Sequence, residues 1–217
     1  MPFNLRLQES DGVIAKKAMV QIASSLNRAL MQAVPVVGSK IKALVGQAIQ
    51  SSPEWKELHG GILQAELGVP QPSARLKEIL DIWMNSLRIT RVPVKLTGTK
   101  ISGGFAIGMI EQNWSDVLSS PSASYVTEKG TLINWLEWLL IAGDKTIISK
   151  YYFTSRVGPK AKSRTGLGIM RENKKSRWHV PREFSGTAQN NFVTRSLDKI
   201  APLIIQTMQT EFEKRIV

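Results

Sequence analysis

The chain has 217 residues, of which 42% are hydrophobic and 21% are charged; these are ordinary proportions for a folded globular protein and exclude global disorder. It contains no cysteine, which excludes disulfides, thiolate catalysis and cysteine-based zinc sites. The net charge is +12, and the segment 145–182, with eleven Lys/Arg and one acid, carries ten of those charges, so the chain is expected to attract polyanions or an acidic protein surface.

The first third of the sequence predicts helices. Apolar residues recur every fourth position from Ile14 to Leu30, which is typical of an amphipathic helix of about two dozen residues. Pro35 is expected to end or kink this helix, because proline removes a backbone donor and restricts the residue before it. A second helical pattern covers 41–49, and the Ser-Ser-Pro-Glu string at 51–54 indicates a helix restart with a serine cap.

The pattern changes near residue 87, where apolar and polar side chains begin to alternate. Residues 87–96 predict a strand, which Pro93 places at a sheet edge or a bulge. A turn at 97–100 and a returning strand at 101–110 follow. This part of the chain is therefore predicted to be a β-hairpin.

A short apolar helix is predicted at 132–140, and it carries Trp135 and Trp138. A helix with so little polar surface belongs either to the core or, if it is exposed, to an interface with a partner. The sequence leaves both alternatives open, so these two tryptophans are candidate interface residues.

The last third of the chain predicts strands and a closing helix. Residues 146–157 have the β-branched and aromatic content of a strand, and 167–171 with 177–180 predict a hairpin pair. From about residue 190 the apolar residues lie on one face of a long helix, which Pro202 is expected to kink.

Helices, then mostly antiparallel strands with an inserted helix, then a final helix predict an α+β fold. We expect N-terminal helices and a long C-terminal helix to pack on a small, mostly antiparallel sheet with an extended basic hairpin or loop. We expect one domain over 1–217, with a helical part at 1–86 and a part at 87–217 that holds the sheet and the C-terminal helix.

The sequence lacks the residue patterns of catalytic and metal sites. His59 stands at a helix end, where it can bond terminal carbonyls, and His179 has only Glu183 and Ser185 nearby as partners for general-base chemistry. The acids are scattered without metal-ligand spacing, and the loop at 158–163 lacks the second glycine of a phosphate loop. We therefore predict that the protein is not an enzyme and has no catalytic, metal or cofactor site.

The basic segment is predicted to form a mobile loop and hairpin that bind a negatively charged partner; a solvated hairpin without a partner is the alternative. The partner is either an acidic protein surface or nucleic-acid phosphate. Aromatic residues at 151–153 are able to stack on bases, but no sequence-specific DNA- or RNA-binding motif accompanies them. The residues expected to contact the partner are Arg156, Lys160, Lys162, Arg164, Arg171, Lys174, Lys175 and Arg177.

Several segments of the C-terminal third occur in an order known from one family. They are the aromatic strand 147–157, the Ser-Arg-Thr-Gly loop at 163–166 with the hairpin after it, the segment 178–187 (WHVPREFSGT), and the segment 191–199 (NFVTRSLDK) that opens the last helix. In this order they resemble the head–tail neck and tail-completion proteins of tailed bacteriophages, a group of minor tail components. Ser196 stands where this family usually has alanine. The resemblance covers about residues 85–217, and the helical region 35–86 departs from the shorter family members.

The resemblance implies a structural virion protein at the head–tail junction, made in the host cytoplasm, that joins the portal or head-completion complex to the tail. Its partners would be copies of itself, in a ring of six or twelve, and neighbouring neck and tail proteins, with non-specific contact to DNA in the lumen. The alternatives are a tail terminator subunit and a non-specific nucleic-acid-binding module. No membrane contact is expected, because the longest apolar run, 135–142, is far below the ~20 residues that cross a bilayer.

Overall fold

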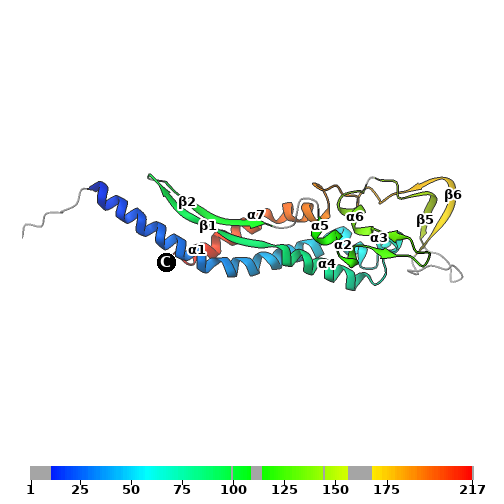
Figure 1. Cartoon of the computed structure of the whole chain (residues 1–217), viewed down its shortest axis with the longest axis horizontal. Helices are drawn as coiled ribbons and strands as arrows, with labels where there is room; N and C mark the ends of the chain where they lie inside the picture. Colours follow the sequence, from blue (N-terminus) through cyan, green and yellow to red (C-terminus); the bar gives the residue numbers. More distant parts are fainter. Residues whose placement is uncertain (1–10, 99, 109–113, 144, 156–167, 217) are drawn as a thin grey trace, which may run out of the picture. The chain divides into compact units, whose positions relative to one another are not determined.

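The structure is a computed structural model, and it describes all residues except 1–10, 99, 109–113, 144, 156–167 and 217. It has an α+β fold, as predicted: a long helix near each end of the chain accompanies small antiparallel sheets (Figure 1). The elements are α1 (Asp11–Gln50), α2 (Pro53–Leu58), α3 (Ile62–Leu67), α4 (Pro72–Ser86), β1 (Arg88–Thr97), β2 (Lys100–Gly108), α5 (Ser115–Leu118), the 3₁₀ turn η1 (Pro121–Ala123), β3 (Tyr125–Val126), β4 (Leu132–Ile133), α6 (Trp135–Leu140), β5 (Ile148–Ser155), β6 (Gly168–Trp178) and α7 (Phe192–Glu213).

The chain divides into two compact units. The first, here called the hairpin unit, comprises the chain up to Ile41, the hairpin Arg88–Gly108 and the chain from Leu203 onward. The second, here called the tryptophan unit, comprises Lys42–Leu87 and the chain from Met109 to Pro202, and all six tryptophans belong to it. Both α1 and α7 contribute to both units. The expected single domain over 1–217 stays a prediction.

Pro35 was predicted to end or kink helix α1. This helix runs without a break from Asp11 to Gln50, so the first alternative is wrong, and the kink stays a prediction. Proline inside a helix removes one backbone hydrogen bond and costs about 3 kcal/mol. Here the helix continues because apolar side chains on both sides of Pro35 are buried along one stripe, with exposures of 0–1%: Ala29, Leu30, Ala33, Val37, Ile41, Val45 and Ile49. By length and composition α1 is also able to span a membrane, a test that core helices pass as well.

In the hairpin unit, β1 and β2 pair antiparallel, and the register shifts between Val92 and Lys95. This irregularity holds Pro93, as the sequence predicted for a residue without an amide donor. Helix α1 is hydrogen-bonded to β1 next to Pro93. The Asn27 side-chain amide donates to the Val94 carbonyl at 3.2 Å and accepts from the Val94 N–H at 2.8 Å. Opposite it stands Gly103, where an added Cβ would lie 2.7 Å from the Val94 Cα.

Near the end of α7, Glu211 forms an ion pair with Lys40 of α1 in the same unit. Its carboxylate is 4% exposed and accepts from Lys40 at 2.7 Å and from Lys214 at 2.9 Å, with Arg215 at 3.1 Å. These three cations lower the pKa of Glu211 to about 2. The hairpin unit therefore depends on a charge cluster as well as on apolar contact.

The tryptophan unit has an aromatic core centred on Trp83, which is fully buried. Its ring lies 6.5 Å from Trp55, 6.4 Å from Trp114 and 5.9 Å from Phe192 between centroids. The predicted restart of the helix at 51–54 is confirmed: the Ser52 hydroxyl accepts from the Trp55 N–H, and proline occupies the first turn of α2.

The first turn of α7 closes this core. The Asn191 side chain, 0% exposed, accepts from the N–H groups of Val193 and Thr194 and donates to the carbonyls of Leu140 and Thr187. One turn later Arg195 reaches back to α2, where its guanidinium lies 2.6 Å from the buried Glu54 carboxylate.

Two predicted elements of the tryptophan unit differ from the structure. The helix predicted over 132–140 begins only at Trp135, because Leu132 and Ile133 form β4 and pair with β3. The hairpin predicted between 167–171 and 177–180 is wrong, because both stretches fall largely on the single strand β6, which pairs with β5. The strands thus form three separate two-stranded antiparallel sheets.

Candidate functional site

Strand β6 carries four of the eight basic residues that the sequence singled out: Arg171, Lys174, Lys175 and Arg177 are all solvent-exposed. Arg156, Lys160, Lys162 and Arg164 lie outside the described residues. Across from β6, Lys150 on β5 adds a fifth exposed cation. Within the described part of the chain none of these five cations forms an ion pair. Their charge is therefore available to a partner.

Two of these lysines, Lys174 and Lys175, lie in a bulge of β6 that has no pairing partner on β5. Tyr151 pairs with Glu172 and Ser149 pairs with Arg177, so the four residues 173–176 stand opposite the single residue Lys150. Lys150 takes the left-handed conformation at φ 68°, and the Lys175 N–H donates to the Asn173 side chain at 3.1 Å, which shapes the turn. We call residues 173–176 the lysine bulge.

The β5–β6 hairpin has two chemically different faces. One face carries aromatic and apolar side chains that line a pocket: Ile148, Tyr151, Phe153, Met170 and Trp178. Tyr152 lies between two of these positions on β5 and pairs with Arg171, so the alternation of a strand places both on the opposite face. Tyr152 is 41% exposed there. One hairpin thus joins a cationic outer face to an apolar inner face.

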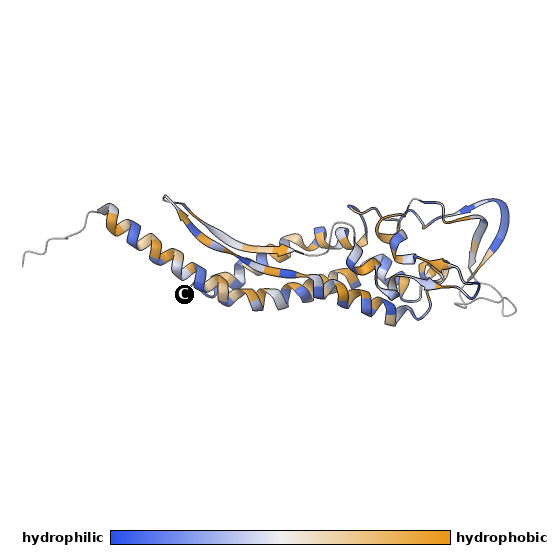
Figure 2. Cartoon of the chain, viewed as in Figure 1, coloured by the Kyte–Doolittle hydropathy of each residue, from blue (hydrophilic) through white to orange (hydrophobic). Residues whose placement is uncertain are grey.

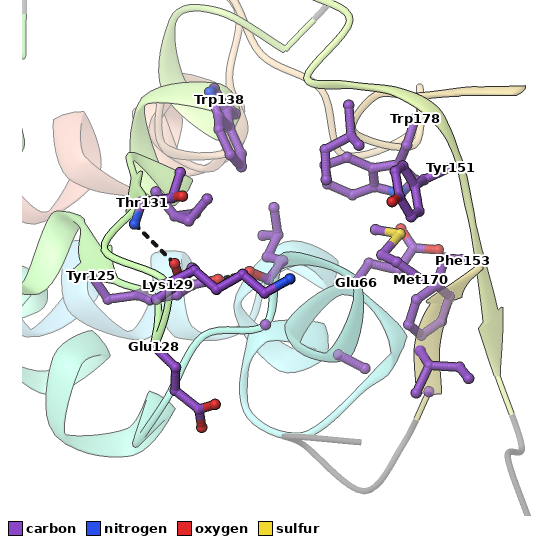
Figure 3. A pocket seen from close by; sticks show the side chains of 18 residues that line it. Glu66, Tyr125, Glu128, Lys129, Thr131, Trp138, Tyr151, Phe153, Met170 and Trp178 are labelled. Atoms are coloured by element: carbon purple, nitrogen blue, oxygen red, sulfur yellow. Dashed lines mark hydrogen bonds between the residues drawn. The ribbon is translucent and has the colours of Figure 1, made fainter. Parts of the chain in front are cut away.

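The pocket has a volume of about 690 Å³ and is bounded by four parts of the tryptophan unit: α3, the β3–β4 sheet, α6 and the β5–β6 hairpin. Figure 3 shows Trp178, Tyr151, Met170 and Phe153 together on one side of it. Trp138 is half-buried and also lines it, with its ring 6.3 Å from the Trp178 ring in an edge-on arrangement. Trp135, by contrast, is 0% exposed and donates its indole N–H to the Ser122 carbonyl, so it lies in the core.

One acid of this pocket, Glu66 on α3, was missed in the sequence. Its Oε2 atom is buried and has no hydrogen-bond partner. Desolvation raises the pKa of Glu66, the Trp178 indole opposes this with a hydrogen bond, Glu183 adds to the rise, and His179 counteracts it. The only sequence signal was a glutamate inside the apolar string Leu-Gln-Ala-Glu-Leu, which is too common to point to a site.

The two histidines form no recognised catalytic arrangement among the described residues. The Nδ1 atom of the exposed His179 lies 2.8 Å from the Val180 carbonyl, and the His59 ring packs near Trp55 with 6.1 Å between centroids. Likewise, no three His, Asp or Glu side chains in the described ranges gather closely enough to hold a metal ion.

A second exposed surface, made of apolar residues, lies on the N-terminal part of α1, in the hairpin unit. The predicted apolar stripe of this helix is buried from Ala29 onward but continues toward the N-terminus as Ile14, Ala18 and Ile22, which are exposed. Figure 2 shows apolar residues continuing to the beginning of the helix. We call these three residues the open stripe.

No protein-family model matches the chain, and no curated protein or solved structure was found to be similar to it. The resemblance to phage neck and tail-completion proteins therefore stays a prediction based on sequence order. In one of the segments that carry the resemblance, 191–199, the described side chains have structural roles: Asn191 caps α7, Phe192 packs against Trp83, and Ser196 donates to the Phe192 carbonyl.

Proposed function

We propose that this protein is a structural subunit that assembles with copies of itself, and that it serves as a ring-forming neck or tail-completion subunit of a tailed-phage virion. The assembly part of the proposal is supported by surfaces that one chain leaves uncovered. The virion part is supported by the resemblance of residues 85–217 to that family.

The open stripe is the observation that carries the proposal. Ile14 is 38% exposed and Ile22 is 50% exposed, whereas Leu30 and Ala33, further along the same helix, are fully buried. Full burial of an aliphatic side chain of this size contributes roughly 1.5–3 kcal/mol. A row of such residues on one side of a helix is typical of a protein–protein contact.

A heterologous contact suits this arrangement. The open stripe and the cationic face of β5–β6 differ in chemistry, so each of them needs its own complementary surface on a neighbouring subunit. A subunit that offers one surface to a different surface of its neighbour forms a ring when the rotation closes. Such a ring is the kind of assembly that a neck or tail-completion subunit builds.

Non-specific nucleic-acid binding is the second candidate, and the pairing of Tyr152 with Arg171 on the outer face of the hairpin favours it. An exposed ring beside a guanidinium is able to stack on a base and neutralise its phosphate. Counterion release makes such binding strongly salt-dependent, so DNA retention would fall steeply between about 50 and 200 mM salt.

Negative-stain electron microscopy of the purified protein tests the proposal. We expect closed rings from the wild-type chain. A variant with Arg171, Lys174, Lys175 and Arg177 all changed to Glu should keep its melting transition and lose the rings. Replacing Lys77, Lys95, Lys100 and Lys199, which are exposed elsewhere, with Glu is the matched control and should keep them. Dispersed single chains in the wild-type sample, together with salt-sensitive DNA retention, would favour the nucleic-acid alternative.

A further inference from the structure

The pocket beside β5–β6 holds a glutamate, Glu66, that forms no ion pair within the described residues. The Oε2 atom of Glu66 is buried without a hydrogen-bond donor, although a buried carboxyl oxygen normally has one. Desolvation of this carboxyl group costs the folded protein free energy, and a cation bound in the adjoining pocket would offset part of that cost. A site of this kind favours a ligand that brings positive charge.

The chain's own cations leave that charge unpaired. Lys129 lines the same pocket, but it is exposed and forms no ion pair within the described residues. The charged groups that act on Glu66 are Glu183, which opposes its ionisation, and His179, which favours it. In Figure 3, Glu66 lies on the side of the aromatic cluster, away from Glu128.

The walls of the pocket suit a basic side chain. Trp178, Tyr151 and Phe153 place aromatic rings on the side of the pocket where Glu66 lies. A cation within about 6 Å of an aromatic face is attracted to it, and the methylene stem of lysine packs on apolar surface while its ammonium group reaches a carboxylate. At about 690 Å³ the pocket lies within the size range of ligand sites and has room for a side chain with its flanking backbone.

The lysine bulge supplies the matching group. Lys174 and Lys175 are exposed and adjacent, and they have no pairing partner on β5. Neither of them lines the pocket of its own chain. The positive bulge and the negative pocket are thus complementary surfaces at separate places on one subunit.

We propose that the Glu66 pocket of one copy of this chain receives Lys174 or Lys175 from the lysine bulge of a second copy. This contact deepens the assembly function proposed above and rests on it. Because the bulge and the pocket are different surfaces, the contact is heterologous, and repetition of it adds further copies in the same direction.

A complementation experiment tests this contact by sedimentation velocity. Glu66→Gln keeps the shape of the pocket and removes its charge, and the double change Lys174→Gln, Lys175→Gln removes the ligand. Each variant alone should associate at least about tenfold more weakly than the wild type, as close charge pairs at interfaces require. A mixture of the two should form a capped dimer, because one partner retains an intact bulge and the other retains an intact pocket.

Matched controls separate the contact from folding and from general charge. Glu213→Gln removes an exposed acid outside the pocket, and Lys199→Gln removes an exposed cation; both residues lie on α7, and both variants should associate as the wild type does. Loss of the Glu66 charge should also raise the melting temperature of the isolated subunit at pH 7, because the folded state no longer holds a desolvated carboxylate. If the Glu66→Gln chain fails to associate but melts at the same or a higher temperature than the wild type, it has lost the contact and not its fold.

The outcomes distinguish this inference from the proposed function. If Glu66→Gln and the double lysine variant both assemble like the wild type, the pocket contact is wrong and the assembly function stands. A failure of the mixture to form dimers also overturns the contact. A wild-type chain that stays single at every concentration contradicts both the contact and the assembly function. Loss of DNA retention in the lysine variant alone, with normal assembly, assigns the bulge to nucleic acid and overturns the inference.

Discussion

The two units of this protein treat their apolar residues differently. Among the described residues, 25 of the 30 buried apolar side chains belong to the tryptophan unit and five, all on α1, to the hairpin unit. Of the 15 exposed large apolar side chains, ten belong to the hairpin unit. The tryptophan unit thus has a core that stabilises its own fold. In the described part of the hairpin unit, many apolar side chains are exposed to solvent and are able to contact another subunit.

This difference assigns separate roles to the two units. Burial of apolar surface is the main favourable term in folding, so the unit with the aromatic core holds its shape in the isolated subunit. The hairpin unit is stabilised by the hydrogen bonds between Asn27 and Val94 of β1 and by the ion pairs around Glu211. Its exposed aliphatic side chains are suited to association between subunits.

The largest effect is expected from the centre of the aromatic core. Changing Trp83 to Ala should lower the free energy of unfolding by about 3–5 kcal/mol, because a fully buried ring in contact with three other aromatic rings is replaced by a cavity. Urea denaturation followed by fluorescence of the other tryptophans measures it. Trp138→Ala is the control of the same residue type and should cost clearly less, since Trp138 is only half-buried. Equal costs at the two positions would show that the core is not centred on Trp83.

A smaller effect is expected from Asn191 at the start of α7. Changing it to Ala removes the cap on the Val193 and Thr194 N–H groups and leaves the Leu140 carbonyl without its donor, so unfolding should be easier by about 2 kcal/mol. Its neighbour Asn190 is exposed, and Asn190→Ala should stay within about 0.5 kcal/mol of the wild type. Thermal denaturation of the pair of variants makes the comparison. A larger loss for Asn190 would contradict the role given to the buried amide.

Low pH should affect the stability of the two units differently. The pKa of Glu211 is about 2 in the folded protein and 4.5 without its partners, so its contribution to stability is present above pH 4.5 and is lost as the pH falls toward 2. Glu66 has the opposite sign: its raised pKa favours the folded tryptophan unit at low pH and that contribution is lost as the pH rises through the folded-state pKa. Helical circular dichroism should therefore decrease before tryptophan fluorescence changes. Simultaneous loss of both signals would contradict independent responses of the units.

The sequence was sufficient for the features that depend on local chemistry. The strand expected over 87–96, the edge or bulge expected at Pro93 and the serine cap before α2 were predicted, and the structure has a strand, a register shift and a serine cap there, since neighbouring residues determine each of them. Pro35 misled the prediction because its effect depends on the buried stripe around it, which tertiary contacts create.

The candidate site was predictable only in part. The exposed cations of β6 follow from composition, because lysine and arginine are rarely buried without a partner. Glu66 and its pocket did not follow, because α3, β4 and the β5–β6 hairpin are distant in sequence and meet only in the fold. The bulge at 173–176 depends on the register with β5, which the alternation of side chains in β6 alone does not determine.

The most direct test of the account concerns the open stripe of the hairpin unit. Its control lies on the same helix: Val13 and Val20 are also exposed, at 44% and 53%, and residues two apart on a helix, such as Val20 and Ile22, point about 200° apart. Glutamine is a good helix former, so changing either pair to Gln preserves α1.

The measurement is the mass of the purified protein by sedimentation equilibrium, for the wild type and for the two paired variants. The wild type should have a mass several times that of the 24.1 kDa chain. Ile14→Gln with Ile22→Gln should reduce this mass to that of smaller species and leave the melting temperature unchanged, whereas Val13→Gln with Val20→Gln should not reduce it. A wild-type mass of one chain, or equal masses for the two variants, would contradict the account.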